Sequence, residues 1–288
     1  MYLYQSQLWY SFIVQDFRAA YKYSQKWVDL YEEFPEMISS NPVYYLKSHH
    51  YLLESLYYLR YNSKLSEVLE KLMAITEDER FVDNENVNTI AFIYGYYGKL
   101  NYHFLNGDFK GGLELIPKIE QELEAQEHNI DPHHLMVFYY KFGCMHFGAD
   151  NWERSVVYLQ KIIENKELGM REDLLCFSRV LRLICFYELG WDHSIDTSIK
   201  STYKFLLKMN DLHQVQKEII AFLRNLNNIY PSELKGAFVD LFNSLKKLED
   251  HPFEKRSFLY LDILSWLECK IENMPIQAII QKKAAVLK

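Results

Sequence analysis

The stretch Gly107-Asp108-Phe109-Lys110-Gly111-Gly112-Leu113 is the clearest turn signature in this chain. It follows an aromatic-rich segment with helical periodicity and opens a second segment of the same kind. Phe109 can fill the junction between neighbouring helix pairs, and Gly112 lets two helix backbones approach closely. The stretch therefore predicts two helices joined by a tight turn.

The same pattern recurs along the chain, which indicates tandem helix pairs. The other turns are Gln15-Asp16-Phe17, Ser63-Lys64-Leu65, Asp150-Asn151-Trp152 and Gly190-Trp191-Asp192. After the last residue of each turn, apolar or small residues follow at steps of 3, 4 and 3. The predicted anchors are Ala20, Ser24 and Trp27, then Val68, Leu72 and Ile75, then Gly112, Ile116 and Ile119, then Ser155, Leu159 and Ile162, and finally Ile195, Ile199 and Thr202.

Composition and periodicity agree with an all-α chain. The 288 residues include only 10 Gly and 7 Pro, which disfavours turn-rich β-architectures, while 49% apolar residues suffice for an extensive core. Apolar residues recur at steps of three and four, as in Ser232 to Leu248, and no stretch alternates in the manner of a strand. We expect about a dozen helices and no sheet.

Charge and cysteine content exclude several classes of protein. Lys and Arg number 32 against 39 Asp and Glu, so a net charge of -7 argues against a nucleic-acid partner. Four cysteines without a C-x-x-C motif indicate reduced, buried thiols. No signal peptide and no run of about 18 apolar residues is present, so we expect a cytoplasmic protein with no membrane partner. Met1 leads directly into a helix without a capping residue, which fits a fragment or a frayed first helix.

The turn at Gly107 resembles the Gly-Asp-aromatic turn of the tetratricopeptide (TPR) family, and Gln15-Asp16-Phe17-Arg18-Ala19-Ala20 is similar to it. Gly143 lies where that family favours glycine in its first helix. The resemblance covers about Tyr2 to Met209. Turns here are about 40 to 47 residues apart, against roughly 34 in the TPR consensus, and the family's closing proline is mostly missing.

The resemblance implies a right-handed superhelical solenoid of antiparallel helix pairs with an inner groove. On this interpretation residues 1–210 form about five TPR-like pairs, and residues 211–288 are capping helices continuous with them. The segment from Pro252 to Glu268 is similar to the closing segments of some bacterial TPR-like proteins. We expect five of its residues to seal the last pair: Phe258, Leu261, Leu264, Trp266 and Leu267.

The resemblance also implies which residues line the groove. Carried over position by position, they are Gln5 and Trp9, then His50, Leu53, Tyr57 and Arg60, then Tyr94, Tyr97 and Asn101, then Tyr140 and Cys144, and finally Arg179 and Arg182, where the register is open by one residue. Tyrosines suit extended peptides, Asn101 can bond a peptide backbone in both directions, and Arg60 and Arg182 can engage a carboxylate. Alternatively, with 23 tyrosines in the chain, these rings belong to the core.

No catalytic or metal-binding pattern stands out. His50 and Glu54 lie one helical turn apart, but a metal site needs three or more ligands. His133 and His134 follow Asp131-Pro132 and belong to the first turn of a helix. Cys176 and Cys185 lie on different faces of one helix without a histidine to activate either thiol. The sequence therefore predicts a non-enzymatic protein without metal or cofactor.

Four functions remain in competition. The first is a scaffold whose groove binds a peptide or another protein. The second is a peptide-sensing regulatory module detached from an N-terminal effector or DNA-binding domain, which the parent reading frame would reveal. The third is an enzyme built on helical repeats, which turnover lost on His50→Ala would support. The fourth is self-association into a homo-oligomer through the helix surfaces.

Overall fold

The computed structural model describes residues 1–75, 84–125, 130–165, 172–209, 212–251, 254, 257–258 and 262–286. Within these ranges every regular element is a helix and no strand is present, which confirms the all-α prediction for them. Contacts divide the chain into two compact units, Met1–Asp131 with Lys283–Lys288 and Pro132–Lys282. The sequence boundary after residue 210 falls inside the second unit and stays a prediction.

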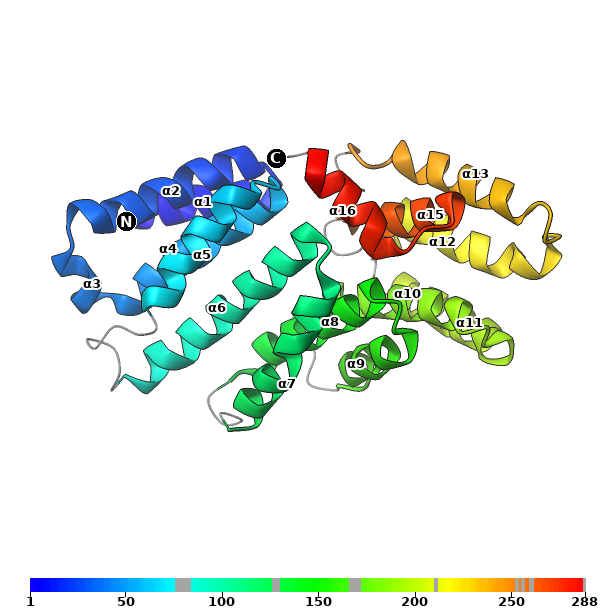
Figure 1. Ribbon diagram of the computed structural model, residues 1–288, viewed down its shortest axis with the longest axis horizontal. Coiled ribbons are helices and arrows are strands. Elements are labelled where there is room, and N and C mark those ends of the chain that lie inside the picture. The colour runs from blue at the N-terminus through cyan, green and yellow to red at the C-terminus, as the bar shows by residue number, and fades with distance from the viewer. Residues whose placement is uncertain are drawn as a thin grey trace. The chain divides into compact units, whose positions relative to one another are not determined.

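The first unit is built from helices that pack on their successors (Figure 1). They are α1 (Tyr2–Ile13), α2 (Phe17–Glu33), the short α3 (Glu36–Ser40), α4 (Pro42–Tyr58), α5 (Asn62–Ile75), α6 (Glu85–Asn106) and α7 (Phe109–Ala125). In addition, α2 packs on α4, and α4 packs on α6. Each helix pair therefore contacts the next pair along the chain.

The second unit is built in the same way. Its helices are α8 (Pro132–Gly148), α9 (Trp152–Glu164), α10 (Glu172–Glu188), α11 (Asp192–Lys208), α12 (Gln214–Asn225), the 3-10 turn η1 (Leu226–Asn228), α13 (Leu234–Lys246), α15 (Ile263–Glu272) and α16 (Ile276–Val286). Here α10 is central, because it contacts α8, α9, α11 and α12. The C-terminal end is closed by α13 packing on α15.

Five helix–helix turns share one backbone device. Each contains a residue with positive φ, between 57° and 64°: Gln15, Arg60, Gly107, Asp150 and Gly190. In each turn the amide of this residue donates to the carbonyl three residues back, and the next amide donates to the carbonyl five residues back. This is the Schellman motif, which satisfies the last carbonyls of a helix. The five turns are thus one structure made from different residues.

The second turn lies three residues earlier than the sequence predicts. The predicted turn, Ser63-Lys64-Leu65, is already inside α5, and Arg60 takes the left-handed position. Arginine is not a residue type that marks the left-handed conformation, so the sequence pattern predicts this turn at the wrong three residues.

The helices that follow these turns bury the same positions. The third, seventh and tenth residues after the first residue of α2, α5, α7, α9 and α11 are all buried. The predicted anchors are confirmed in four of these helices. In α5 the buried residues are Leu65, Leu69, Leu72 and Ile75, so the predicted anchors Leu72 and Ile75 are buried and only Val68 is half-buried.

A small residue at the first anchor position brings two backbones together. Ser155 of α9 is fully buried, and its Oγ donates to the carbonyl of Gly143 in α8 at 2.8 Å. A Cβ atom at Gly143 would lie 3.1 Å from Leu159 Cδ2. A side chain at Gly143 would therefore require Leu159 to shift by a few tenths of an ångström.

Helix α15 is held by packing and by a buried carboxylate. Leu264, Trp266 and Leu267 are buried as predicted, Phe258 is half-buried, and Leu261 lies outside the described residues. The indole Nε1 of Trp266 and the Nζ of Lys270 each donate to one carboxylate oxygen of Glu188 on α10, whose side chain is 8% exposed.

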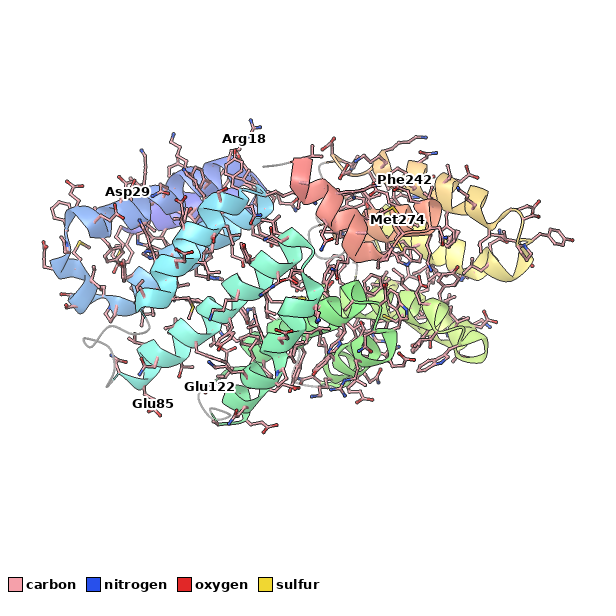
Figure 2. The ribbon with its side chains drawn as sticks, viewed as in Figure 1. Arg18, Asp29, Glu85, Glu122, Phe242 and Met274 are labelled. Carbon is pink, nitrogen blue, oxygen red and sulfur yellow. The ribbon has the colours of Figure 1, made fainter. Side chains whose placement is uncertain are left out.

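Charged side chains such as Arg18, Asp29 and Glu85 are exposed and point away from the helices (Figure 2). Among the described residues, no helix is both long enough and apolar enough to cross a bilayer.

Candidate functional site

Three predicted groove residues of the first unit form one cluster. The ring of His50 on α4 stacks on Tyr94 of α6, with centroids 4.1 Å apart and planes at 8°, and lies 6.2 Å from the ring of Tyr97. Tyr94 and Tyr97 are buried, and His50 is half-buried. Burial raises the pKa of the Tyr94 hydroxyl. The cluster therefore packs α4 against α6 and exposes only part of the imidazole.

Asn101 is also engaged within the first unit. It is 1% exposed, and its Nδ2 donates to Oε1 of Glu54 at 2.8 Å. This bond links α6 to α4. It occupies the amide group of Asn101, which the sequence analysis expects to bind a peptide backbone. The sequence relates Glu54 only to a metal site with His50. It does not reveal Glu54 as the partner of Asn101, because the two residues are 47 positions apart.

The other predicted residues of the first unit differ in exposure. Trp9 is 49% exposed. Tyr57 is half-buried, and Arg60 is exposed at the end of α4. Gln5 and Leu53 are buried.

In the second unit, Tyr140 is buried and Cys144 is half-buried. Burial raises the pKa of the Cys144 thiol to about 12, although its hydrogen bond with Tyr140 opposes this. Burial likewise raises the pKa of Cys185 to about 12. Both thiols are therefore protonated at neutral pH. Cys185 is buried as the sequence predicts, whereas Cys144 is half-buried.

Arg179 and Arg182 form the most distinctive polar group of the second unit. They lie one turn apart on α10, and both are half-buried. The guanidinium carbon of Arg179 lies 4.1 Å from the ring centroid of Phe205 on α11, and that of Arg182 lies 5.3 Å from Phe186. The aromatic rings hold the two guanidinium groups on one face of α10.

The hydrogen-bonding capacity of this arginine pair is largely unused. The Nε atoms of both residues are buried and have no hydrogen-bond partner. Nη1 of Arg182 donates to Oε1 of Gln160 on α9. Among the described residues neither guanidinium forms an ion pair, although buried arginines are ordinarily paired. Two positive charges are thus partly removed from water without a carboxylate.

The electrostatics of the pair follow from this arrangement. Burial lowers the pKa of both guanidinium groups, and the charge of Arg179 lowers the pKa of Arg182 further. Glu164 opposes the shift of Arg182 from a distance. Gln160 lies between Arg182 and Glu164: its Oε1 accepts from Arg182, and its Nε2 donates to Glu164 Oε1 at 2.6 Å. A neutral amide therefore occupies the place where a carboxylate would neutralise Arg182.

Planar guanidinium forks match carboxylates and phosphates, so the arginine pair can hold an anion. The pair supplies no carboxylate, thiolate or imidazole to bind a metal cation. Within the described ranges no group of three or more His, Cys, Asp or Glu residues is placed to hold a metal ion.

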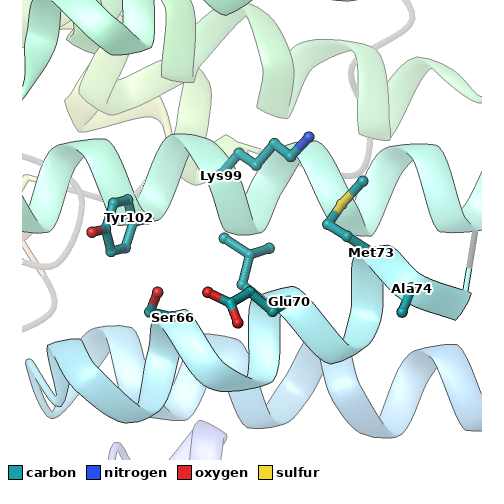
Figure 3. Close-up of a pocket in the computed structure, with 7 residues that line it drawn as sticks. Ser66, Glu70, Met73, Ala74, Lys99 and Tyr102 are labelled. Atoms are coloured by element: carbon teal, nitrogen blue, oxygen red, sulfur yellow. The ribbon is translucent and has the colours of Figure 1, made fainter.

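An open hollow of about 470 Å³ lies between α5 and α6 in the first unit. Ser66, Glu70 and Met73 line it from α5, and Lys99 and Tyr102 line it from α6 (Figure 3). Glu70 and Lys99 point in different directions there. Burial and the charge of Lys118 lower the pKa of Lys99. The opposite charges do not converge on a point, so the hollow holds no defined binding group.

Sequence reasoning found the two arginines but missed Phe205 and Gln160. Phe205 lies 26 positions after Arg179, and Gln160 lies 22 positions before Arg182. No pattern in one sequence links residues at these separations.

The chain matches no protein-family model, no curated protein and no solved structure. Its function is therefore argued from its own residues.

Proposed function

We propose that this protein is a non-catalytic, cytoplasmic scaffold that binds an acidic peptide segment of a partner protein through Arg179 and Arg182. The observation that carries the proposal is the pair of half-buried guanidinium groups, neither of which forms an ion pair with a carboxylate among the described residues. Burying a charge without a partner costs free energy, and a bound carboxylate would recover it. The four free cysteines favour a reducing compartment.

We further propose that the helix pairs of each unit stack as in a right-handed TPR-like solenoid. Two features support this: the five Schellman turns and the anchors buried at fixed positions after them. In such a stack the first helix of each pair lines the inner face, and α10 is a first helix. The arginine pair would then lie where an extended chain can pass.

A peptide-binding experiment tests the function. The probe is a fluorescein-labelled peptide rich in Asp and Glu, and its control is the same peptide with Asn and Gln. Fluorescence anisotropy should show tighter binding of the acidic peptide. The double variant Arg179→Gln/Arg182→Gln should weaken binding by at least about 10-fold, because each lost bidentate pair is a charged hydrogen-bonded contact.

The matched control is Arg154→Gln/Arg224→Gln, which removes the same charge from the same unit. Both of these arginines are exposed, and each lies over a tyrosine ring. The control should change binding by less than about 3-fold, because exposed charges contribute little. Equal losses in the two double variants, or equal binding of the acidic and neutral peptides, would refute the proposal.

A further inference from the structure

The first helix has an apolar face that its own unit leaves uncovered. We name Tyr2, Leu3, Ser6, Trp9, Tyr10 and Ile13 the α1 face, because these exposed residues share one side of α1. Leu3, Tyr10 and Ile13 are 68%, 63% and 79% exposed. Six of the thirteen large apolar side chains exposed among the described residues lie within residues 2–14. Such a concentration marks an interaction surface rather than scattered exposure.

The geometry points to a second copy of this chain as the occupant of the α1 face. Leu3, Ser6, Tyr10 and Ile13 follow one another at steps of 3, 4 and 3, the spacing of a packed helix seam. In an antiparallel pair of α1 helices related by a twofold axis, Leu3 lies opposite Ile13 of the other copy. Ser6 then lies opposite Tyr10, so a small side chain meets a large one on both sides of the axis.

The polar group at the centre of the α1 face does not oppose burial. Ser6 Oγ donates to the carbonyl of Tyr2 at 2.9 Å, so its hydroxyl already has a partner within α1. Burying this hydroxyl against a tyrosine ring leaves no donor unsatisfied. The helix also lacks any Asp, Glu, Lys or Arg, so two copies can meet without like charges despite the net charge of -7.

The available area is sufficient for a stable dimer. From the exposed fractions of its five large side chains, the α1 face presents roughly 650 Å² per chain, at about 200 Å² for each fully exposed side chain. Two copies that covered all of this area would bury roughly 1,300 Å², at the lower end of the range of about 1,200 to 2,000 Å² for specific interfaces. We propose that α1 pairs with α1 of a second copy to form an antiparallel homodimer.

Sedimentation equilibrium of the full chain tests the dimer. The unmodified protein should sediment as a dimer at about 100 µM, with a dissociation constant of micromolar order. Leu3→Glu and Ile13→Lys, made separately, should each weaken dimerisation by roughly 100-fold, because every substitution occurs twice in a symmetric interface. Circular dichroism would verify that each variant retains its helices.

Mixing the two variants gives the decisive result. In the antiparallel pair, the glutamate introduced in one chain meets the lysine introduced in the other only in the mixed dimer. Mixing Leu3→Glu with Ile13→Lys should therefore restore association to within about 10-fold of the unmodified protein. A misfolded variant could not be rescued in this way. The control Tyr230→Glu, at a site 72% exposed in the second unit, should leave the dimer unchanged.

Three outcomes would overturn the proposal: a monomer at every concentration, a dimer that tolerates Leu3→Glu, or single variants that mixing does not rescue. A monomer that instead binds another molecule through the α1 face would assign this surface to a different partner. None of these outcomes affects the arginine pair, because peptide binding is measured separately.

Discussion

Replacing Gly190 by alanine should destabilise the second unit through the backbone alone. Gly190 has φ +64°, and a Cβ added there would meet nothing within 4 Å. No clash therefore contributes. The left-handed conformation costs an L-residue about 1–2 kcal/mol, and the smaller entropy of the unfolded alanine chain offsets about 0.4–1 kcal/mol. The free energy of unfolding of the second unit should therefore fall by about 1 kcal/mol.

Gly236→Ala provides a matched control with the opposite sign. Gly236 lies in α13, in the same unit, and its added Cβ would also meet nothing within 4 Å. Here the substitution should raise the free energy of unfolding by about 0.5 kcal/mol, because glycine is the poorer helix former. The two identical substitutions should thus differ by about 1.5 kcal/mol, measured as free energy of unfolding in urea by circular dichroism and fluorescence.

A result in which both variants shift stability in the same direction would refute the reasoning, since only the backbone conformation distinguishes them. Both sites lie in the second unit, so separate unfolding of the units would not confuse the comparison. The first unit offers a reciprocal test. Arg60 has φ +57°, and Arg60→Gly should stabilise that unit by about 0.5–1 kcal/mol.

Three further predictions concern charge and pH. Burial lowers the pKa of His146 to about 4, so the unfolded chain takes up a proton first as pH falls from about 6.5 to 4, and the free energy of unfolding falls over that window. His146→Phe should reduce this loss, as urea unfolding at a series of acidic pH values would measure. An unchanged dependence of stability on acidic pH would contradict the prediction. Glu188→Gln should cost about 3 kcal/mol of unfolding free energy by leaving Lys270 partly buried without its anion, whereas a loss below about 1 kcal/mol would count against a buried ion pair. Cys144 and Cys185 should react with iodoacetamide at pH 8 at least about 100-fold more slowly in the folded protein than in urea, as mass spectrometry of peptides would measure; comparable rates would show that the thiols are accessible.

Much of the local structure could be predicted because it depends on neighbouring residues. Helical periodicity, the turns at Gly107 and Asp150, and the buried anchors behind them all follow from residues within a few positions. The second turn was misplaced because Arg60 adopts a left-handed conformation that its side chain does not announce. The amides of Arg60 and Tyr61 donate to the carbonyls of Tyr57 and Leu56, and these backbone hydrogen bonds do not depend on residue type.

The candidate site was less predictable because long-range packing determines exposure. A resemblance indicates which face of a helix turns inward, but not how far a neighbouring helix covers it. Tyr94, Tyr97 and Tyr140 are buried, as the alternative interpretation of these rings as core residues predicts, while Arg179 and Arg182 remain half-buried beside Phe205 and Phe186 respectively.

The carboxylate of Glu188 has a consequence for the order in which the chain folds during synthesis. Its partners Trp266 and Lys270 are added 78 and 82 residues later. At about 5–20 residues per second, the ribosome needs roughly 4–16 s to supply them. Until then Glu188 lacks both the indole and the ammonium group that bind it in the folded chain. The second unit can therefore reach its complete structure only after α15 has been synthesised.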